Sequence, residues 1–223
     1  MTNDQRPRAN DSGPTTDSRR PKTIVIGGHS RNVGKTSVVA GLIAALPEFD
    51  WTALKITQYG HGICSANGQA CDCATNDHSG AISEEKDHDG DSDTARFLNA
   101  GAAKVWWVRT EQGRLAEAMP FIREKIANAK NIIIESNSIV KFLHPDIYLV
   151  VLDPSTADFK TSAREFLDQA AAVIVHENKG AYPQWKDVSL KPVADKPIFR
   201  ITPPPYVTPE IVNFVREMLG ARS

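Results

Sequence analysis

The residues best suited to chemistry lie in one short segment near the start of the chain, where an apolar run leads into a polar loop. The segment reads Ile24-Val25-Ile26-Gly27-Gly28-His29-Ser30-Arg31-Asn32-Val33-Gly34-Lys35-Thr36-Ser37. A loop of this kind between a strand and a helix binds phosphate, because backbone N–H groups point at the anion. The Lys35 ammonium can neutralise the β- and γ-phosphates, and the Thr36 hydroxyl can hold Mg²⁺. The segment therefore predicts a nucleotide site formed by Ser30, Arg31, Asn32, Val33, Gly34, Lys35, Thr36 and Ser37.

One residue departs from the usual spacing of such a loop. The pattern G-x-x-x-x-G-K-[ST] requires glycine at the position of His29, whereas the nearest glycines here are Gly27 and Gly28. A shift of the tight turn by one or two residues would accommodate the histidine, and the expected strand before and helix after are both present. The alternative is a glycine-containing turn of a dinucleotide-binding fold without this phosphate site.

Further candidates follow other expected strands. The run Asn131-Ile132-Ile133-Ile134-Glu135 has the form of a Walker B strand, whose terminal acid binds Mg²⁺ directly or through water. The alternative is a buried strand that ends in a solvated glutamate. Lys55 follows the second expected strand, where it would contact phosphate or substrate or would be an ordinary surface lysine. Because ligands bind beyond the carboxyl ends of parallel strands, these residues are expected to lie near the phosphate loop.

Apolar periodicity predicts an α/β fold, with helices on a mostly parallel central sheet of about seven strands. Strands are expected at residues 23–28, 51–57, 104–109, 131–136, 147–153, 172–177 and 197–201. Helices are expected near residues 35–46, 92–100, 114–129, 160–171 and 208–219. Pro120 lies inside the third helical pattern, so that helix is expected to kink or to start late.

The motifs resemble those of two groups of known proteins. The loop from Gly28 to Thr36 resembles the phosphate loop of dethiobiotin synthetase and cobyrinic acid diamide synthase, which also lacks glycine at the usual first position. The segment Asp91-Ser92-Asp93-Thr94-Ala95-Arg96-Phe97, followed by Ala100-Gly101-Ala102, resembles the Gly-Lys-Asp-Ser/Thr, Arg and Ala-Gly-Ala elements of MobB, the molybdopterin-guanine dinucleotide biosynthesis adaptor. Both groups belong to the SIMIBI class of P-loop NTPases. Together the similarities span residues 23–155.

This resemblance implies a three-layer P-loop NTPase fold and gives roles to single residues. Lys35 and Thr36 would hold phosphate and Mg²⁺. Lys55 lies where the synthetases place a lysine after the second strand, and with Lys35 it is predicted to be catalytic. Glu135 lies where both families place the acid of a Val-Glu-Gly segment, although this chain continues as Ser136-Asn137.

Asp93 ends an acidic run that begins at Glu84. The run from Glu84 to Asp89 is expected to be solvated, because its spacing does not fit a calcium-binding loop. Asp93 instead lies near the start of an expected helix and in the MobB-like segment, so it is predicted to hold Mg²⁺ or substrate. The alternative is a first-turn acid that interacts with the helix dipole.

All three cysteines, Cys64, Cys71 and Cys73, lie in a long connection at about residues 58–92, between His61 and His78. Three thiols within ten residues predict a soft-metal site for Zn²⁺ or an iron–sulfur cluster. A loop with reduced cysteines is the alternative, and a disulfide is disfavoured in a cytoplasmic protein.

Base recognition is indicated by Asn178, which follows the strand expected at 172–177. The pair Asn178-Lys179 matches the start of the Asn-Lys-x-Asp element of GTPases, but residue 181 is alanine. Without a carboxylate to pair with guanine, ATP is favoured over GTP. A comparable asparagine in the dethiobiotin synthetase family implies that Asn178 contacts adenine.

Composition limits the classes of function. The 223 residues have a formal net charge of −1, which gives no electrostatic basis for binding nucleic acid or an anionic membrane. The polar residues 1–21 are expected to be a disordered tail, and residues 22–223 a nucleotide-binding domain. No apolar run suits a signal or a membrane span, so a cytoplasmic protein is expected. A homodimer is the assembly considered.

Two functions follow from the sequence. The first is Mg²⁺-dependent nucleoside triphosphate hydrolysis or phosphoryl transfer to a small molecule, in the biosynthesis of a cofactor. The second is a nucleotide-switched adaptor or metallochaperone that acts on a partner enzyme and uses the cysteine connection as its metal site.

Overall fold

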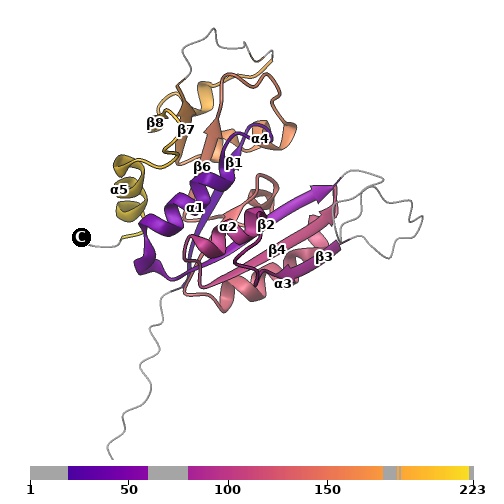
Figure 1. The fold of residues 1–223 in the computed structure, drawn as a ribbon. Helices are drawn as coiled ribbons and strands as arrows, with labels where there is room; N and C mark the ends of the chain where they lie inside the picture. The colour runs from indigo at the N-terminus through magenta and orange to yellow at the C-terminus, as the bar shows by residue number, and fades with distance from the viewer. Residues whose placement is uncertain (1–19, 60–79, 178–184, 186, 221–223) are drawn as a thin grey trace, which may run out of the picture.

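Strands and helices alternate along the chain of the computed structural model, which describes residues 20–59, 80–177, 185 and 187–220. One sheet lies between helices (Figure 1). Its strands are β1 (Lys22–Gly28), β2 (Trp51–Tyr59), β3 (Gly80–Glu84), β4 (Lys104–Glu111), β5 (Asn131–Glu135), β6 (Ile147–Leu152), β7 (Ala172–His176) and β8 (Ile198–Ile201). The α-helices are α1 (Lys35–Ala45), α2 (Asp93–Asn99), α3 (Leu115–Ala127), α4 (Thr161–Glu165) and α5 (Pro209–Met218). Short 3₁₀ turns are η1 (Pro47–Phe49), η3 (Ser138–Lys141), η4 (Leu167–Gln169) and η5 (Lys191–Val193).

The sheet has eight strands in the order β3-β4-β2-β5-β1-β6-β7-β8. All neighbours are parallel except β3, which pairs antiparallel with β4 at one edge. The expected mostly parallel α/β sheet is therefore confirmed, with one strand more than predicted. The extra strand β3 belongs to the connection that was expected at 58–92.

The two faces of the sheet follow from the alternation of side chains along each strand. On β1, Ile24 and Ile26 belong to one hydrophobic cluster with residues of α1, α2 and α5, whereas Val25 belongs to a second cluster with residues of α3 on the opposite face. On β5, Ile133 lies on the first face and its two neighbours lie on the second. Both faces of the central strands are thus buried, which gives three layers and explains why these strands are continuous apolar runs.

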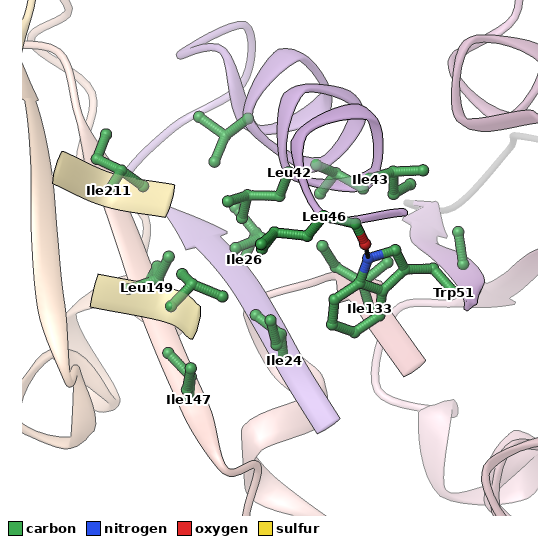
Figure 2. Close-up of a cluster of buried hydrophobic side chains, with 14 of the residues drawn as sticks. Ile24, Ile26, Leu42, Ile43, Leu46, Trp51, Ile133, Ile147, Leu149 and Ile211 are labelled. Atoms are coloured by element: carbon green, nitrogen blue, oxygen red, sulfur yellow. Dashed lines mark hydrogen bonds between the residues drawn. The ribbon is translucent and has the colours of Figure 1, made fainter. Parts of the chain in front are cut away.

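Helix α1 is fixed to the sheet by the core that Figure 2 shows. Leu42 and Ile43 of α1 are buried there with Ile24 and Ile133. Just beyond α1, the indole Nε1 of Trp51 donates a hydrogen bond to the backbone oxygen of Leu46 at 2.8 Å. A buried tryptophan needs such a partner for its N–H group. The packing fixes the position of α1, and with it the phosphate loop that precedes this helix.

Two predicted helices differ in detail from the structure. The pattern at 160–171 forms α4 and then the separate 3₁₀ turn η4. Pro120 lies inside α3, which begins at Leu115, so this helix does not start late. Within the described residues, no helix is both long and apolar enough to cross a bilayer.

Candidate functional site

The phosphate loop, residues 29–34, joins the end of β1 to the start of α1. Asn32 and Gly34 have positive φ angles of 58° and 88°. Gly34 must be glycine for a second reason, because a Cβ at this position would overlap the ring of Tyr206. The Lys35 side chain folds back across the loop and its Nζ donates to the backbone oxygen of Ser30 at 2.6 Å. The ammonium group is thus held over the loop where an anion would lie.

His29 is accommodated in the loop with its side chain turned into the protein interior. Its side chain is fully buried, with ring centroids 5.2 Å from Phe159 and 5.0 Å from Trp185. Its Nδ1 lies 2.7 Å from the backbone oxygen of Asp158, and its Nε2 accepts the backbone N–H of Asp153 at 3.0 Å. These contacts fit a neutral imidazole that donates from Nδ1, and burial lowers the pKa of His29.

The loop is braced from two sides. After β6, the Asp158 carboxylate accepts the Ser30 hydroxyl at 2.6 Å, and the backbone N–H of Lys160 donates to the His29 oxygen at 2.8 Å. After β5, Asn137 makes a double contact with Gly28, accepting its N–H at 2.7 Å and donating to its oxygen at 2.8 Å. Asn137 follows Ser136, which takes the place of the glycine in the Val-Glu-Gly segment of the similar families. Through its bonds to Gly28, Asn137 has a structural role.

A cluster of oxygen atoms and one ammonium group lies beside the loop. The Thr36 hydroxyl donates to Glu135 Oε2 at 2.9 Å. Lys55 Nζ lies 3.0 Å from each Glu135 oxygen and 2.6 Å from Asp93 Oδ2. The side chains of Glu135 and Lys55 are only 7% and 15% exposed, whereas that of Asp93 is 41% exposed. Three elements, β2, β5 and α2, thus bring these groups to the start of α1.

These residues line one cleft of about 590 Å³ at the carboxyl ends of the strands. Among the described residues that line it, five are cationic and two are acidic: Arg31, Lys35, Lys55, Arg96 and Lys160, and Asp93 and Glu135. Arg96 Nη2 also donates to the Ser37 hydroxyl at 3.0 Å, which joins α2 to α1. The excess of positive charge suits an anionic ligand such as a polyphosphate.

Two of these lysines are held in an unfavourable environment for a charged group. Burial lowers the pKa of Lys35 to about 8, although the Glu135 carboxylate acts in the opposite direction. Burial and the neighbouring Arg31 lower the pKa of Lys160. A bound anion would relieve both effects because it favours the protonated amines.

The structure brings most of the predicted site residues together. The cleft is lined by Arg31, Asn32, Gly34, Lys35, Thr36, Ser37, Lys55, Asp93 and Glu135. Ser30 and Val33 are buried. The Ser30 hydroxyl is bonded to Asp158 and the Val33 side chain belongs to the hydrophobic core, so only their backbone groups are left for the predicted contact with phosphate. Cys64, Cys71, Cys73 and Asn178 lie outside the described residues. Within the described part of the chain, no three His, Cys, Asp or Glu side chains gather as a metal site.

Sequence reasoning missed seven residues that line the cleft, four consecutive residues of β2 (Ile56, Thr57, Gln58 and Tyr59) together with Arg96, Lys160 and Tyr206. Arg96 follows Asp93 by three positions, a spacing that places both on one side of α2, so its position could have been inferred. Lys160 lies eight residues beyond β6, and Tyr206 reaches the loop from the segment after β8. No local pattern marks either residue, because only the tertiary fold brings them to the loop.

Comparisons with known proteins return structures but no sequence relatives. Neither a protein family nor a curated protein matches the chain. HypB from Helicobacter pylori, solved in complex with nickel, is 13% identical over 90% of this chain and 86% of its own, with a TM-score of 0.49. A LAO/AO transport system kinase is 10% identical over 91% and 60%, with a TM-score of 0.49. LpxK from Aquifex aeolicus, in complex with ATP, is 16% identical over 81% and 53%, with a TM-score of 0.44.

These likenesses are too weak to say what this chain binds, and the chain spans 60% or less of the kinase and of LpxK. The structure itself shows the fold. Strand β1, the loop, the Lys35-Thr36 pair at the start of α1 and the parallel neighbour β5 ending in Glu135 form the arrangement of a P-loop NTPase. The class-level expectation of a P-loop NTPase fold is thereby confirmed.

Proposed function

We propose that the chain binds a nucleoside triphosphate with Mg²⁺ in this cleft, as a member of the SIMIBI class. The observation that carries the proposal is the convergence of Lys35, Thr36, Lys55, Asp93 and Glu135 at the start of α1. A helix N-terminus, a partly buried lysine, a carboxylate at the end of a strand and a second carboxylate at the start of a helix can together hold a triphosphate and its metal.

The donor set fits Mg²⁺. Thr36 supplies a hydroxyl, while Glu135 and Asp93 supply carboxylates, and all three are hard oxygen donors. Mg²⁺ keeps several waters and needs only one or two carboxylates beside the phosphates, so two acids are sufficient. When bound, the ion would neutralise charge on the phosphates. Thr36 and Glu135 would hold it beside the loop.

Phosphoryl transfer is supported by the placement of cations on several sides of the cleft. Lys35 would contact the β- and γ-phosphates, and Lys55 and Arg96 would stabilise charge on the transferring group. We propose ATP as the nucleotide, since residue 181 is alanine where guanine recognition requires a carboxylate. The resemblance to the synthetases favours a role in cofactor biosynthesis with a small-molecule acceptor.

The replacement Lys35→Ala tests the proposal. It removes a phosphate contact from a residue that is outside the hydrophobic core, so we expect Mg-ATP affinity to fall sharply while the fold is kept. Calorimetric titration with Mg-ATP and Mg-GTP measures the loss and the base preference. Lys196→Ala is the matched control, because Lys196 does not line the cleft. Unchanged affinity in Lys35→Ala would refute the phosphate-loop function.

The adaptor or metallochaperone function is kept as a second candidate because α2 contacts the phosphate site. Asp93 and Arg96 of α2 bond Lys55 and Ser37, so a change at the phosphates would reach the segment that follows the cysteine connection. Elemental analysis of anaerobically purified protein, beside a Cys64→Ser, Cys71→Ser, Cys73→Ser variant, tests it. Bound Zn or Fe that is lost in the variant favours the adaptor. No metal, or equal metal in both proteins, favours the enzyme.

A further inference from the structure

Lys55 lies at the centre of the oxygen cluster that the proposed function assigns to Mg²⁺. Its Nζ is 2.6 Å from Asp93 Oδ2 and 3.0 Å from both Glu135 oxygens. Thr36 completes the group by donating to Glu135 Oε2. In the folded chain, two of the three proposed metal ligands, Asp93 and Glu135, therefore contact an ammonium group of the protein, and the third, Thr36, is bonded to Glu135. We call Thr36, Asp93 and Glu135 the oxygen cage.

Charge explains why this ammonium is stable there. Glu135 is nearly buried, and a buried carboxylate is costly unless a cation or several hydrogen bonds compensate it. Lys55 supplies the cation and contacts both oxygens of that carboxylate. Lys55 also contacts Asp93, so its one positive charge compensates the carboxylates of both acids.

Lys55 and a divalent cation cannot share this position. Mg²⁺ binds oxygen at about 2.0–2.1 Å and would take the same carboxylate oxygens. The ion would then lie within a few ångströms of the Lys55 ammonium, where like charges repel strongly at low effective dielectric. Metal binding must therefore be accompanied by movement of Lys55 away from Glu135.

We propose that Lys55 and a divalent cation are alternative occupants of the oxygen cage, so that the metal binds together with a nucleotide and not before it. The nucleotide phosphates offer the displaced ammonium a new anionic partner in the same cleft. Without phosphates the ammonium has no better partner than the two acids, and it excludes the metal. The inference rests on the proposed nucleotide site and specifies how that site orders its ligands.

The same exchange releases Asp93 from its ion pair with Lys55. Asp93 is the first residue of α2, and Arg96 one turn later is bonded to Ser37 of α1. Metal binding would thus replace one contact of α2 and leave the other in place. The contacts of α2 would therefore change at its first turn, where Asp93 lies, when the metal binds.

Mn²⁺ binding to the nucleotide-free protein tests the inference, because Mn²⁺ replaces Mg²⁺ and is detected directly by electron paramagnetic resonance. We expect wild-type protein to bind Mn²⁺ weakly and Lys55→Met to bind it about tenfold more tightly or better, since a positive charge within 3.0 Å of the cage is removed. Lys160→Met is the matched control, because Lys160 lines the same cleft but its charge interacts with Arg31 and Asp158. Equal Mn²⁺ affinity in wild type and Lys55→Met would overturn the proposal.

Two further measurements keep the result decisive. Lys55→Gln retains a hydrogen-bond donor without the charge, so it should also tighten Mn²⁺ binding if Lys55→Met folds poorly, as judged by thermal melting. Titration of each protein with Mn²⁺ in the presence of ATP separates the proposed nucleotide site from the proposed exchange at Lys55. If Mn-ATP does not bind the wild type, the proposed function fails. If Mn-ATP binds normally but the lysine variants do not change Mn²⁺ affinity, only the exchange at Lys55 fails.

Discussion

Glu135 is the residue on which the proposed metal dependence of the site rests. Its carboxylate accepts Thr36 and Lys55, and its side chain is nearly buried at the end of β5. Glu135→Gln keeps the shape but removes the anionic charge that a divalent cation requires. We expect Mg-ATP binding or turnover to fall about 10- to 100-fold, with a much smaller effect on ATP binding in the presence of a chelator.

Comparing ATP binding with Mg²⁺ and with a chelator distinguishes a metal ligand from a residue that only supports the fold. An equal loss with and without Mg²⁺ would show that Glu135 supports the fold and does not bind the metal. Glu217→Gln in α5 is a matched control that should change neither measurement, because surface substitutions of this kind act within about 0.5 kcal/mol. Titration calorimetry supplies both affinities.

The sequence predicts the positions of the chemical groups better than their directions. Lys35, Lys55 and Glu135 could be placed because the sequence assigns each to the end of a strand or to the loop after it, and parallel strands bring their carboxyl ends to one edge. In the structure Glu135 is the last residue of β5, whereas Lys55 lies within β2 and not after it. The buried orientation of His29 and Val33 could not be inferred. In an irregular loop, side-chain direction depends on single φ and ψ values and on partners such as Asp158, which is 129 residues away from His29.

At the scale of elements, the phosphate loop is held by the segments after β5 and β6. Asn137 satisfies both backbone groups of Gly28, the last residue of β1. Asn137→Ala would leave these partly buried groups without that partner, so we expect a loss of about 1–3 kcal/mol in the free energy of unfolding. ATP affinity should also fall, because the loop is less rigidly placed.

Denaturant unfolding and ATP titration check this expectation together. Asn213→Ala is the matched control, since Asn213 is exposed on α5 and its Oδ1 accepts a long 3.4 Å hydrogen bond from Arg216. A variant at Asn137 that is as stable as this control, with unchanged ATP affinity, would show that the loop does not depend on the brace.

Elements with weak patterns account for the differences between the predicted and the observed sheet. Strand β3 has five residues with alternating exposed and half-buried side chains, and it contains one large apolar residue, Ile82. Its pairing with β4 is decided by tertiary contact at the sheet edge, not by its own sequence. The central strands were predictable because burial on both faces requires continuous apolar runs.

At the scale of the whole molecule, two buried histidines couple protonation to folding. Burial lowers the pKa of His29 and of His176 below 6.5, although the Asp153 carboxylate opposes this for both. Below about pH 6.5 the unfolded chain binds protons that the folded chain does not, so the free energy of unfolding decreases as the pH falls. The decrease has a limit of about 1.4 kcal/mol per pH unit for each histidine, and it ends once the pH passes the pKa of the folded state.

The histidines are separated from other acid-sensitive groups by comparing variants. Glutamine retains a polar side chain but does not titrate, so His29→Gln should have a shallower dependence of unfolding free energy on pH between 7.5 and 5 than the wild type. His29→Gln with His176→Gln should be shallower still, while the carboxylates shared by all three proteins contribute equally and cancel. Urea unfolding at several pH values measures these slopes. Parallel curves for the three proteins would mean that neither imidazole resists protonation in the folded state, and the neutral His29 that bridges Asp153 and Asp158 beneath the phosphate loop would then be the wrong description of this site.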